Sequence, residues 1–391
     1  MLFDFNIYSS LLLPPFIHGI LFTVLLIVRG IRQSTKSDLL LAALLLINTL
    51  TIANYMLGFA GWYDSHDAYT TFMFYFPFHN DVWIGPLLYF YFLSLTNTQF
   101  TFSRKDLPHF ILPGLWVLMI ITKGIADYLL YYPFPDIPDN QFGTKGKWAQ
   151  LDNFIVLRYI GYISFFYYLF LTLKAFKKYQ QYVKENFSST EEISFTWLRN
   201  LLYAISTAVI VMVLFEIINF VHDGLSYTQD WFAYLAIGIV SYYLSIAGYF
   251  TRTISLQHLN FVPEKAISPV TENVEPEIQV WKTKLLMHIE TNRPYLEPEL
   301  SLNELAKQMG TNSSLLSKVI NDGTGRNFND FINHFRVKEV IRKLRAGEQE
   351  TQTLLGIALD SGFNSKATFN RSFKKETGKT PKEYIESLVT S

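Results

Sequence analysis

Long apolar runs recur through the first two thirds of this 391-residue sequence. A helix that crosses the hydrocarbon core of a bilayer, about 30 Å thick, needs about 20 mostly apolar residues. We predict seven membrane-spanning helices, at residues 8–28, 38–60, 78–96, 108–130, 153–173, 198–221 and 230–250. The third run begins with polar residues and contains Pro86, which membrane helices tolerate where neighbours satisfy the freed carbonyl.

The pattern changes after Arg252. Residues 253–280 are polar, contain three prolines and have no sustained apolar period, which indicates a linker. The remainder is rich in charge and has short amphipathic periods, which are typical of small soluble helices. We therefore predict an all-α chain with a transmembrane domain at 1–252, a linker at 253–280 and a small soluble domain at 281–391.

Two helix-turn-helix motifs are predicted in the soluble domain. In the first, Ser301 and Glu304 form a capping box, Gly310 supplies the turn and Asn312 caps the second helix. In the second, Gly362 supplies the turn and the following helix buries its phenylalanines. We expect Asn364 to cap that helix, and we expect the apolar face of residues 327–347 to join the two motifs as one helix.

The stretches "SLNELAKQMGTNSSLLSKVIN", "RVKEVIRKL" and "IALDSGFNSKATFNRSFKKETGKTPKEY" carry a family resemblance. Residues 283–386 resemble the AraC/XylS-type DNA-binding domain, whose two second helices enter successive major grooves of double-stranded DNA. This resemblance implies a transcription regulator that binds double-stranded DNA. We expect it to act on DNA as a homodimer. It places base-facing positions at Ser314, Leu315 and Lys318 in the first motif, and at Lys366, Ala367, Asn370 and Arg371 in the second. Ser317 and Lys374 also lie on the outward faces of these helices, and we expect them to contact DNA as well.

The chemistry of the second motif agrees with that assignment. Arg371 suits the two acceptors on the edge of guanine, and Asn370 suits adenine. Lys374, Lys375 and Lys379 are better placed for phosphate, which adds affinity without sequence information. The structural alternative is a charged surface that is only solvated. In the first motif, a stretch that is usually basic in the family holds Asn321, Asp322 and Gly323. We therefore expect the first motif to bind phosphate weakly.

Lys and Arg in the connections predict the orientation of the chain. They follow the first, third, fifth and seventh predicted spans, whereas the other connections hold only Lys145 and Lys147. The N-terminus is thus expected outside the cell and the C-terminus in the cytoplasm. An odd number of spans requires the same result. We expect the protein in the inner membrane of a bacterium.

The ionisable residues inside the predicted spans include Lys123, Arg158 and Glu216. Charges in a bilayer are costly, so each is a candidate for function. With His79, Asn80 and Asp81 they are expected to form a polar pocket that binds a small ligand. The structural alternative is an ion pair of Arg158 with Glu216, and a Lys123 side chain that reaches the interface.

Composition narrows the chemistry further. The chain has no cysteine, which excludes disulfides and thiolate zinc sites. We find no catalytic or metal-binding motif, and we expect no enzyme activity, no metal and no cofactor. The start of the chain lacks the positive residues of a signal peptide, so we expect its first apolar run to be retained.

These observations predict a membrane-anchored transcription regulator whose spans act as a sensor. One alternative is an integral membrane transporter or enzyme with a regulatory DNA-binding tail, for which the spans offer no paired acids and no clear inverted repeat. A second alternative is a passive DNA tether, which would need no polar pocket. Substitution of the intramembrane charges separates the three.

Overall fold

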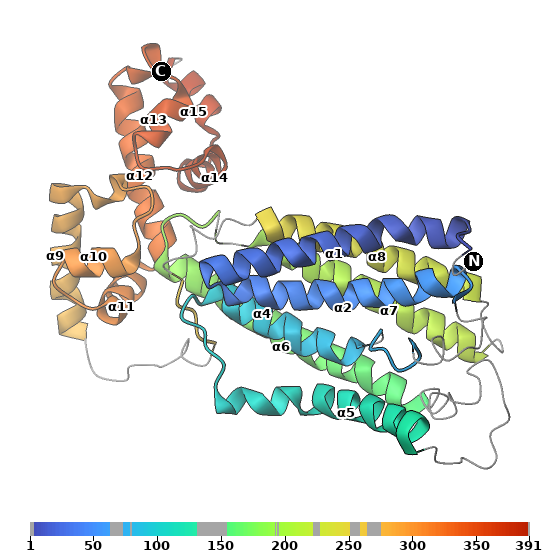
Figure 1. Cartoon of the computed structure of the whole chain (residues 1–391). Helices are drawn as coiled ribbons and strands as arrows, with labels where there is room; N and C mark the ends of the chain where they lie inside the picture. The colour runs from blue at the N-terminus through green and yellow to red at the C-terminus, as the bar shows by residue number, and fades with distance from the viewer. Residues whose placement is uncertain are drawn as a thin grey trace. The chain divides into compact units, whose positions relative to one another are not determined.

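The computed structural model describes residues 4–62, 73–78, 80–130, 155–191, 193, 195–221, 227–250, 259–263 and 275–389. This described part is built from helices and contains no β-strand, in agreement with the predicted all-α class (Figure 1). The chain divides into two compact units. The apolar unit comprises Met1–Ala175 and Thr196–Asn260, and the polar unit comprises Phe176–Phe195 and Phe261–Ser391.

The apolar unit is a bundle of helices. Its elements are α1 (Ile7–Gln33), α2 (Lys36–Phe59), α4 (Ile84–Thr96), α5 (Ile111–Ile125), α6 (Ile155–Asn186), α7 (Thr196–Val221) and α8 (Tyr227–Phe250). Short 3-10 helices precede α4 and α5, at Asp81–Trp83 and Arg104–Phe110, and the π-helical turn Ala126–Leu130 follows α5. The last residues of α6 belong to the polar unit.

Among the described residues, six helices are long and apolar enough to cross a membrane. They are Ile7–Gln33, Lys36–Phe59, Arg104–Ile125, Tyr159–Asn186, Thr196–Phe215 and Trp231–Phe250. The prediction of seven long spans is therefore not confirmed. The third predicted span, 78–96, contains the 3-10 helix Asp81–Trp83 and the 13-residue α4, which is about 20 Å long at the rise of an α-helix.

The segment around α4 nevertheless extends through much of the apolar unit. At its start, the carbonyl oxygen of Phe78 accepts a 3.2 Å hydrogen bond from Thr51 Oγ1 in α2. After its end, the backbone N–H of Thr98 donates a 3.0 Å hydrogen bond to Leu259, which follows α8. Most side chains of α4 are buried by the surrounding helices, which explains why its backbone tolerates an irregular start.

One end of the apolar unit is basic. The guanidinium of Arg29 in α1 makes two hydrogen bonds to the Asp38 carboxylate in α2, at 2.6 and 2.7 Å. The same guanidinium also donates to the Tyr249 carbonyl near the end of α8. At this end, Lys36 Nζ donates a 2.7 Å bond to the carbonyl of Phe100. The ends of α1 and α8, the start of α2 and the residues after α4 thus lie together.

At the opposite end, the start of α1 contacts both α2 and α8. The Asn6 side chain donates a 2.7 Å bond to the carbonyl of Phe59, and Trp231 Nε1 donates a 3.0 Å bond to Tyr8. Close contact of α1 with α2 depends on a glycine, because a Cβ on Gly19 would lie 2.1 Å from Thr49 Oγ1. Small residues at such contacts are typical of helices packed within membranes.

The outer surface of the apolar unit is itself apolar. On α5, Leu115 and Leu118 are 57% and 55% exposed, and Phe170 on α6 is 62% exposed. Similar side chains are exposed along α1, α7 and α8. Monomeric soluble proteins rarely expose apolar surface of this extent.

The polar unit contains smaller helices. They are α9 (Glu275–Asn292), α10 (Leu302–Gln308), α11 (Ser313–Thr324), α12 (Phe328–Arg345), α13 (Leu354–Leu359), α14 (Lys366–Thr377) and α15 (Pro381–Val389). The interval predicted as a linker includes the first residues of α9 and two buried side chains, Leu259 and Phe261. Part of that interval is therefore anchored to packed structure.

Helix α12 joins two separate hydrophobic cores. Its first half contributes Phe328, Phe331 and Ile332 to a core with α9, α10 and α11. Its second half contributes Val337, Val340 and Leu344 to a core with α13 and α14. The single apolar face predicted for this helix is thus divided between two motifs. Phe335, which lies within this helix, is only partly buried and packs against the first core.

Candidate functional site

The first helix-turn-helix motif, α10 and α11, has the local structure that its sequence predicts. Ser301 and Glu304 form the capping box, with Ser301 Oγ accepting from the Glu304 backbone N–H at 3.2 Å. Gly310 has a positive φ of 67° in the turn. The Asn312 side chain accepts a 2.8 Å hydrogen bond from Leu315 N and caps α11. The predicted capping and turn residues of this motif are confirmed.

The second motif, α13 and α14, differs from its prediction at one residue. Ser365 caps α14, because its Oγ accepts a 3.2 Å hydrogen bond from Thr368 N. The prediction that Asn364 caps this helix is wrong. Asn and Ser both suit the position before a helix, so the sequence alone could not show which of the two residues caps α14. The side chain of Asn364 instead donates to Ser189 Oγ.

The turn of the second motif requires glycine for two reasons. Gly362 has a φ of 90°, where a side chain is disfavoured. A Cβ at this position would also lie 2.2 Å from the carbonyl oxygen of Tyr295 and 3.0 Å from Arg336 Nε. The turn is therefore packed directly against the segment that precedes the first motif.

The residues assigned to DNA contact in α11 differ in exposure. Ser314 is exposed, whereas Ser317 and Lys318 are half-buried. Leu315 is half-buried and packs against the core of its own motif. Leu315 was assigned to DNA contact, but its side chain also helps to form the hydrophobic core.

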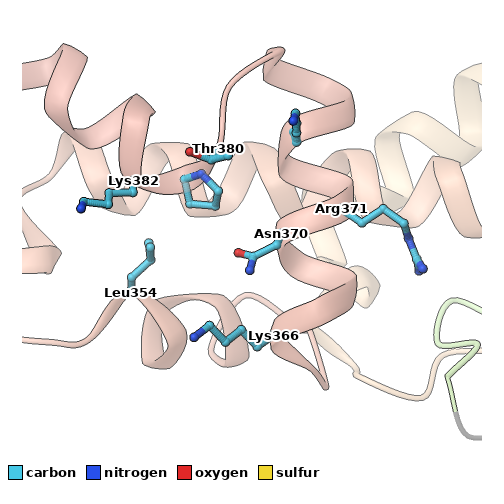
Figure 2. A pocket seen from close by; sticks show the side chains of 8 residues that line it. Leu354, Lys366, Asn370, Arg371, Thr380 and Lys382 are labelled. Atoms are coloured by element: carbon cyan, nitrogen blue, oxygen red, sulfur yellow. The ribbon is translucent and has the colours of Figure 1, made fainter.

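The residues assigned to DNA contact in α14 share one exposed side of the helix. All five are exposed: Lys366, Ala367, Asn370, Arg371 and Lys374. Four of them line a depression between α13, α14 and α15 (Figure 2). Leu354, Thr380, Pro381 and Lys382 complete its wall. Four cationic side chains around one depression are suited to an anionic partner such as a phosphate backbone.

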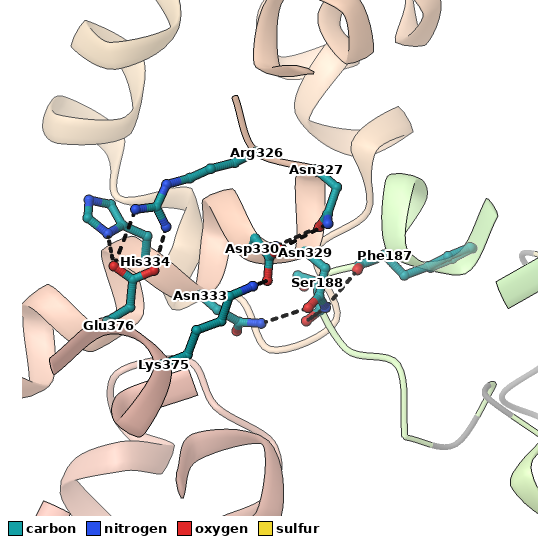
Figure 3. Close-up of polar contacts among 10 residues, drawn as sticks. All are labelled: Phe187, Ser188, Arg326, Asn327, Asn329, Asp330, Asn333, His334, Lys375 and Glu376. Atoms are coloured by element: carbon teal, nitrogen blue, oxygen red, sulfur yellow. Dashed lines mark hydrogen bonds and ion pairs between the residues drawn. The ribbon is translucent and has the colours of Figure 1, made fainter. Parts of the chain in front are cut away.

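A polar network fixes α14 to the other helices of the polar unit. Glu376 accepts hydrogen bonds from Arg326 and from His334 Nδ1, the latter at 2.7 Å (Figure 3). Burial would raise the pKa of the Glu376 carboxyl, but these two hydrogen bonds and the charges of their donors outweigh it and lower the pKa. Lys375, predicted to bind phosphate, forms a 2.7 Å salt bridge with Asp330. Lys375 is thus engaged within the protein.

Arg336 on α12 is 1% exposed and was not among the predicted site residues. Its guanidinium donates to the carbonyl oxygens of Tyr295, Glu297 and Pro298 at 2.7–3.2 Å. It also contacts Asn333 Oδ1 and Ser188 Oγ. Burial lowers the pKa of Arg336 to about 9. One sequence signal was available, because Arg336 lies four residues from both Ile332 and Val340, on the buried face.

The predicted polar pocket of the spans falls partly outside the described residues. The backbones of Arg158 and Glu216 lie in α6 and α7, but their side chains, like His79, are outside the described part. Lys123 is buried in α5, with 7% exposure, one turn before the buried Asp127. The Tyr75 hydroxyl donates to Asp127. Lys123 thus lies in the interior of the apolar unit and does not extend to its surface.

Two polar contacts of the apolar unit were not predicted. Arg29 was assigned only to a basic connection, yet it binds the buried Asp38. His18 Nε2 and Ser245 Oγ lie 2.6 Å apart between α1 and α8. Both partners come from distant positions in the sequence, so periodicity within one helix did not reveal them. Among the described residues, no group of three His, Asp or Glu side chains is arranged to hold a metal ion.

Comparison with known proteins identifies one part of the chain. Residues 305–387 match the protein family described as "Helix-turn-helix domain". An uncharacterized HTH-type transcriptional regulator of Staphylococcus aureus (strain COL) is 37% identical over 90 residues, 23% of this chain and 12% of that protein. The probable transcription factor PqrA of Proteus vulgaris is 30% identical over 99 residues, 24% of this chain and 79% of that protein.

One solved structure was also found. A protein of unknown function from Listeria innocua is 31% identical, with a TM-score of 0.24, over 27% of this chain and 93% of that one. The matched relatives are named as transcriptional regulators and not as enzymes, in agreement with the sequence-based expectation.

Proposed function

Because this chain belongs to the helix-turn-helix transcription regulators, with an AraC-type domain in its C-terminal part, we propose that it is a membrane-anchored, sequence-specific regulator. Residues 1–252 anchor it in a bilayer and sense a signal, and residues 281–391 bind promoter DNA. In this proposal, α11 and α14 are the helices that enter the major groove. The chain spans only 12% of the length of the S. aureus relative. The family match lies at residues 305–387, within the polar unit.

The observation that carries the membrane anchor is the apolar exterior of the apolar unit. Its helices expose leucine, isoleucine and phenylalanine side chains outward, while Arg29, Asp38 and Lys123 are mostly or fully buried. This distribution suits a solvent that is itself apolar, because charged side chains then need partners inside the protein.

The arrangement of its basic end supports an orientation. At this end, basic residues flank the helix ends that lie together: Arg29, Arg32, Lys36, Arg104 and Lys105. By the positive-inside rule, this end faces the cytoplasm, and the N-terminus of α1 faces outward. In this proposal the segment of α4 is a broken seventh crossing, and most side chains of α4 are buried in protein.

In this proposal, different exposed residues make the base contacts and the phosphate contacts. Arg371 and Asn370 read base edges, whereas Lys366, Lys374 and Lys382 hold phosphates. Two copies bind as a dimer on half-sites about one helical turn apart. A small-molecule signal in the apolar unit changes how the two copies pair, and thereby changes occupancy of the half-sites.

Two measurements on the full-length protein test the proposal. Reporter fusions to the C-terminus determine its side of the membrane, and we expect activity from a cytoplasmic fluorescent reporter and none from a periplasmic phosphatase. Genome-wide mapping of bound DNA should then yield a shared sequence. Arg371→Ala should weaken that enrichment and relax the shared sequence at one base pair. Lys338→Ala on α12 is a matched loss of a cation outside the interface.

Either half of the proposal can fail separately. Recovery of the protein in the soluble fraction after cell lysis would overturn the membrane anchor. Equal genome-wide profiles for the wild type and Arg371→Ala would overturn base reading by α14.

A further inference from the structure

The connection between α6 and α7 is part of the polar unit and lies against its helices. This connection, residues 187–191, is called the α6–α7 loop below. It forms an isolated backbone bridge with the first motif, between Phe187 and Ser301. The Ser188 backbone N–H also donates a 3.1 Å hydrogen bond to the carbonyl of Leu300. A loop that joins two candidate spans is thus paired with the DNA-binding part of the chain.

Helix α12 holds the first half of this loop. The Asn329 side-chain amide donates to the carbonyl oxygens of Phe187 and Ser188, at 3.1 and 2.8 Å (Figure 3). Arg336 donates a 3.1 Å hydrogen bond to Ser188 Oγ. Ser188 is fully buried. The loop therefore supplies one of the acceptors that compensate for burial of the Arg336 guanidinium.

Helix α14 and the turn before it hold the second half of the loop. The Thr368 hydroxyl donates a 2.7 Å hydrogen bond to the Glu191 carboxylate. The side-chain amide of Asn364 donates to Ser189 Oγ. Four of the five loop residues, Phe187, Ser188, Ser189 and Glu191, thus contact the first motif, α12 or the second motif.

The contacts leave the proposed DNA-facing side of α14 open. Thr368 is buried, and its position on the helix differs from that of the exposed Lys366, Asn370 and Arg371. These three side chains remain exposed while the loop is bound. The docked loop is therefore compatible with an occupied groove, and its contacts restrict how the two motifs move relative to one another.

The loop is also fixed at the start of α7. The Tyr179 hydroxyl of α6 donates a 2.7 Å hydrogen bond to the carbonyl of Ile193. Phe195 has a positive φ of 44°, a costly conformation for this residue type, and is held by stacking on Tyr179 with 5.7 Å between ring centroids. Both ends of the loop are thus tied to helices that continue into the apolar unit.

We propose that the α6–α7 loop is an intramolecular brace: when it is docked on Asn329, Arg336, Asn364 and Thr368, it holds the two motifs in the arrangement that binds DNA. The brace rests on the proposed function. It gives the apolar unit a direct means of control, since a change in the spacing of α6 and α7 withdraws the loop. Withdrawal leaves Arg336 short of an acceptor and frees the two motifs.

The absence of native cysteine allows a direct test of docking. Ser189→Cys with Asn364→Cys is prepared in the full-length protein in phosphatidylethanolamine and phosphatidylglycerol nanodiscs. A short bifunctional thiol reagent should link the pair efficiently. The control pair is Ser189→Cys with Lys382→Cys, since Lys382 lines the depression and has no contact with the loop. Equal crosslinking of both pairs would overturn docking, whatever the protein does with DNA.

DNA affinity tests the consequence of docking. The probe is the duplex most enriched in genome-wide mapping, with a random duplex as the reference. Ser188→Ala and Thr368→Val each remove loop hydrogen bonds without a change in charge. Together they should weaken binding about tenfold, because the hydrogen bonds from Arg336 to Ser188 and from Thr368 to Glu191 are both lost. Thr190→Ala and Thr368→Ser are the matched controls and should retain the wild-type affinity.

The salt dependence and the crosslinked protein determine the sign of the effect. The slope of log affinity against log salt should stay unchanged in the double variant, because no phosphate contact is lost. The Ser189→Cys, Asn364→Cys variant should bind the enriched duplex at least as tightly after crosslinking as before it. Loss of binding on crosslinking would show inhibition instead of bracing. Wild-type protein that does not distinguish the enriched duplex from the random one would contradict the proposed function, while the crosslink still reports docking.

Discussion

Arg336 Nε donates a 2.8 Å hydrogen bond to the carbonyl oxygen of Tyr295, and this contact ties α12 to the segment before the first motif. The guanidinium has no carboxylate within salt-bridge distance among the described residues, and its partners are backbone carbonyls and two side-chain oxygens. A buried cation held in this way joins elements that are far apart in the sequence. Its planar shape matters, because a lysine has fewer donors and a different geometry.

Arg336→Met should therefore destabilise the polar unit by about 3–5 kcal/mol, since several buried carbonyl oxygens lose their donor. Arg345→Met, at an exposed position of the same helix, should change stability by less than about 0.5 kcal/mol. Hydrogen exchange of α12 and α14 in the full-length protein measures both. Equal protection in the two variants would contradict a structural role for Arg336.

Gly362→Ala should destabilise the second motif by about 3 kcal/mol or more, because the new Cβ meets the Tyr295 carbonyl and the φ is positive. Gly310 also has a positive φ, but a Cβ there has nothing within 4 Å. Gly310→Ala should thus lose only about 1 kcal/mol, the cost of the backbone conformation. Thermal unfolding of the two variants, monitored by the proteolysis of the polar unit, compares their stabilities. Similar losses would mean that the turn tolerates the added carbon.

The Glu376 network should stabilise the polar unit in a pH-dependent way. Its folded pKa lies below the unfolded value of about 4.3. The contribution is therefore fully present above the unfolded pKa and is lost as the pH falls through the folded pKa. Glu376→Gln should lower stability at pH 7, and the difference from the wild type should shrink towards pH 3. A difference that stays constant between these pH values would indicate that the carboxylate charge is not involved.

Arg371 and Lys374 should contribute to DNA binding in different ways. Arg371→Ala should cost about 1–3 kcal/mol and relax the preference at one base pair. Lys374→Ala should weaken all duplexes similarly and reduce the salt slope by about 1. Binding to a panel of single-base variants at several salt concentrations separates the two. The roles would be reversed if Lys374→Ala, and not Arg371→Ala, changed the base preference.

The Arg29–Asp38 pair should stabilise the apolar unit. Arg29→Ala leaves the buried Asp38 carboxylate without its bidentate partner and should cost about 3–5 kcal/mol. Asp38→Asn combined with Arg29→Gln should recover part of that loss, since no unpaired charge remains. Arg32→Ala, at an exposed position three residues later, is the control. Unfolding in detergent micelles measures all three, and equal stability of Arg29→Ala and Arg32→Ala would exclude a role for the pair.

The sequence alone determined the local features of this protein. Apolar length predicted the candidate spans, and glycine and capping residues predicted both turns, because these properties depend on neighbours within a few residues. The count of seven long spans was not confirmed at α4, since burial by other helices allows a short apolar segment to lie inside the unit. The prediction for the cap of α14 was wrong for a different, local reason. Two adjacent residues, Asn364 and Ser365, both have side chains suited to the position.

The tertiary structure decided which distant residues meet. The contacts of Arg336 with Tyr295 and of Asn329 with the α6–α7 loop join residues separated by 41 and more than 140 positions. Periodicity records which face of a helix is buried, but not what buries it. The pairing of a loop between two apolar helices with both DNA-binding motifs is therefore visible only after the chain has folded.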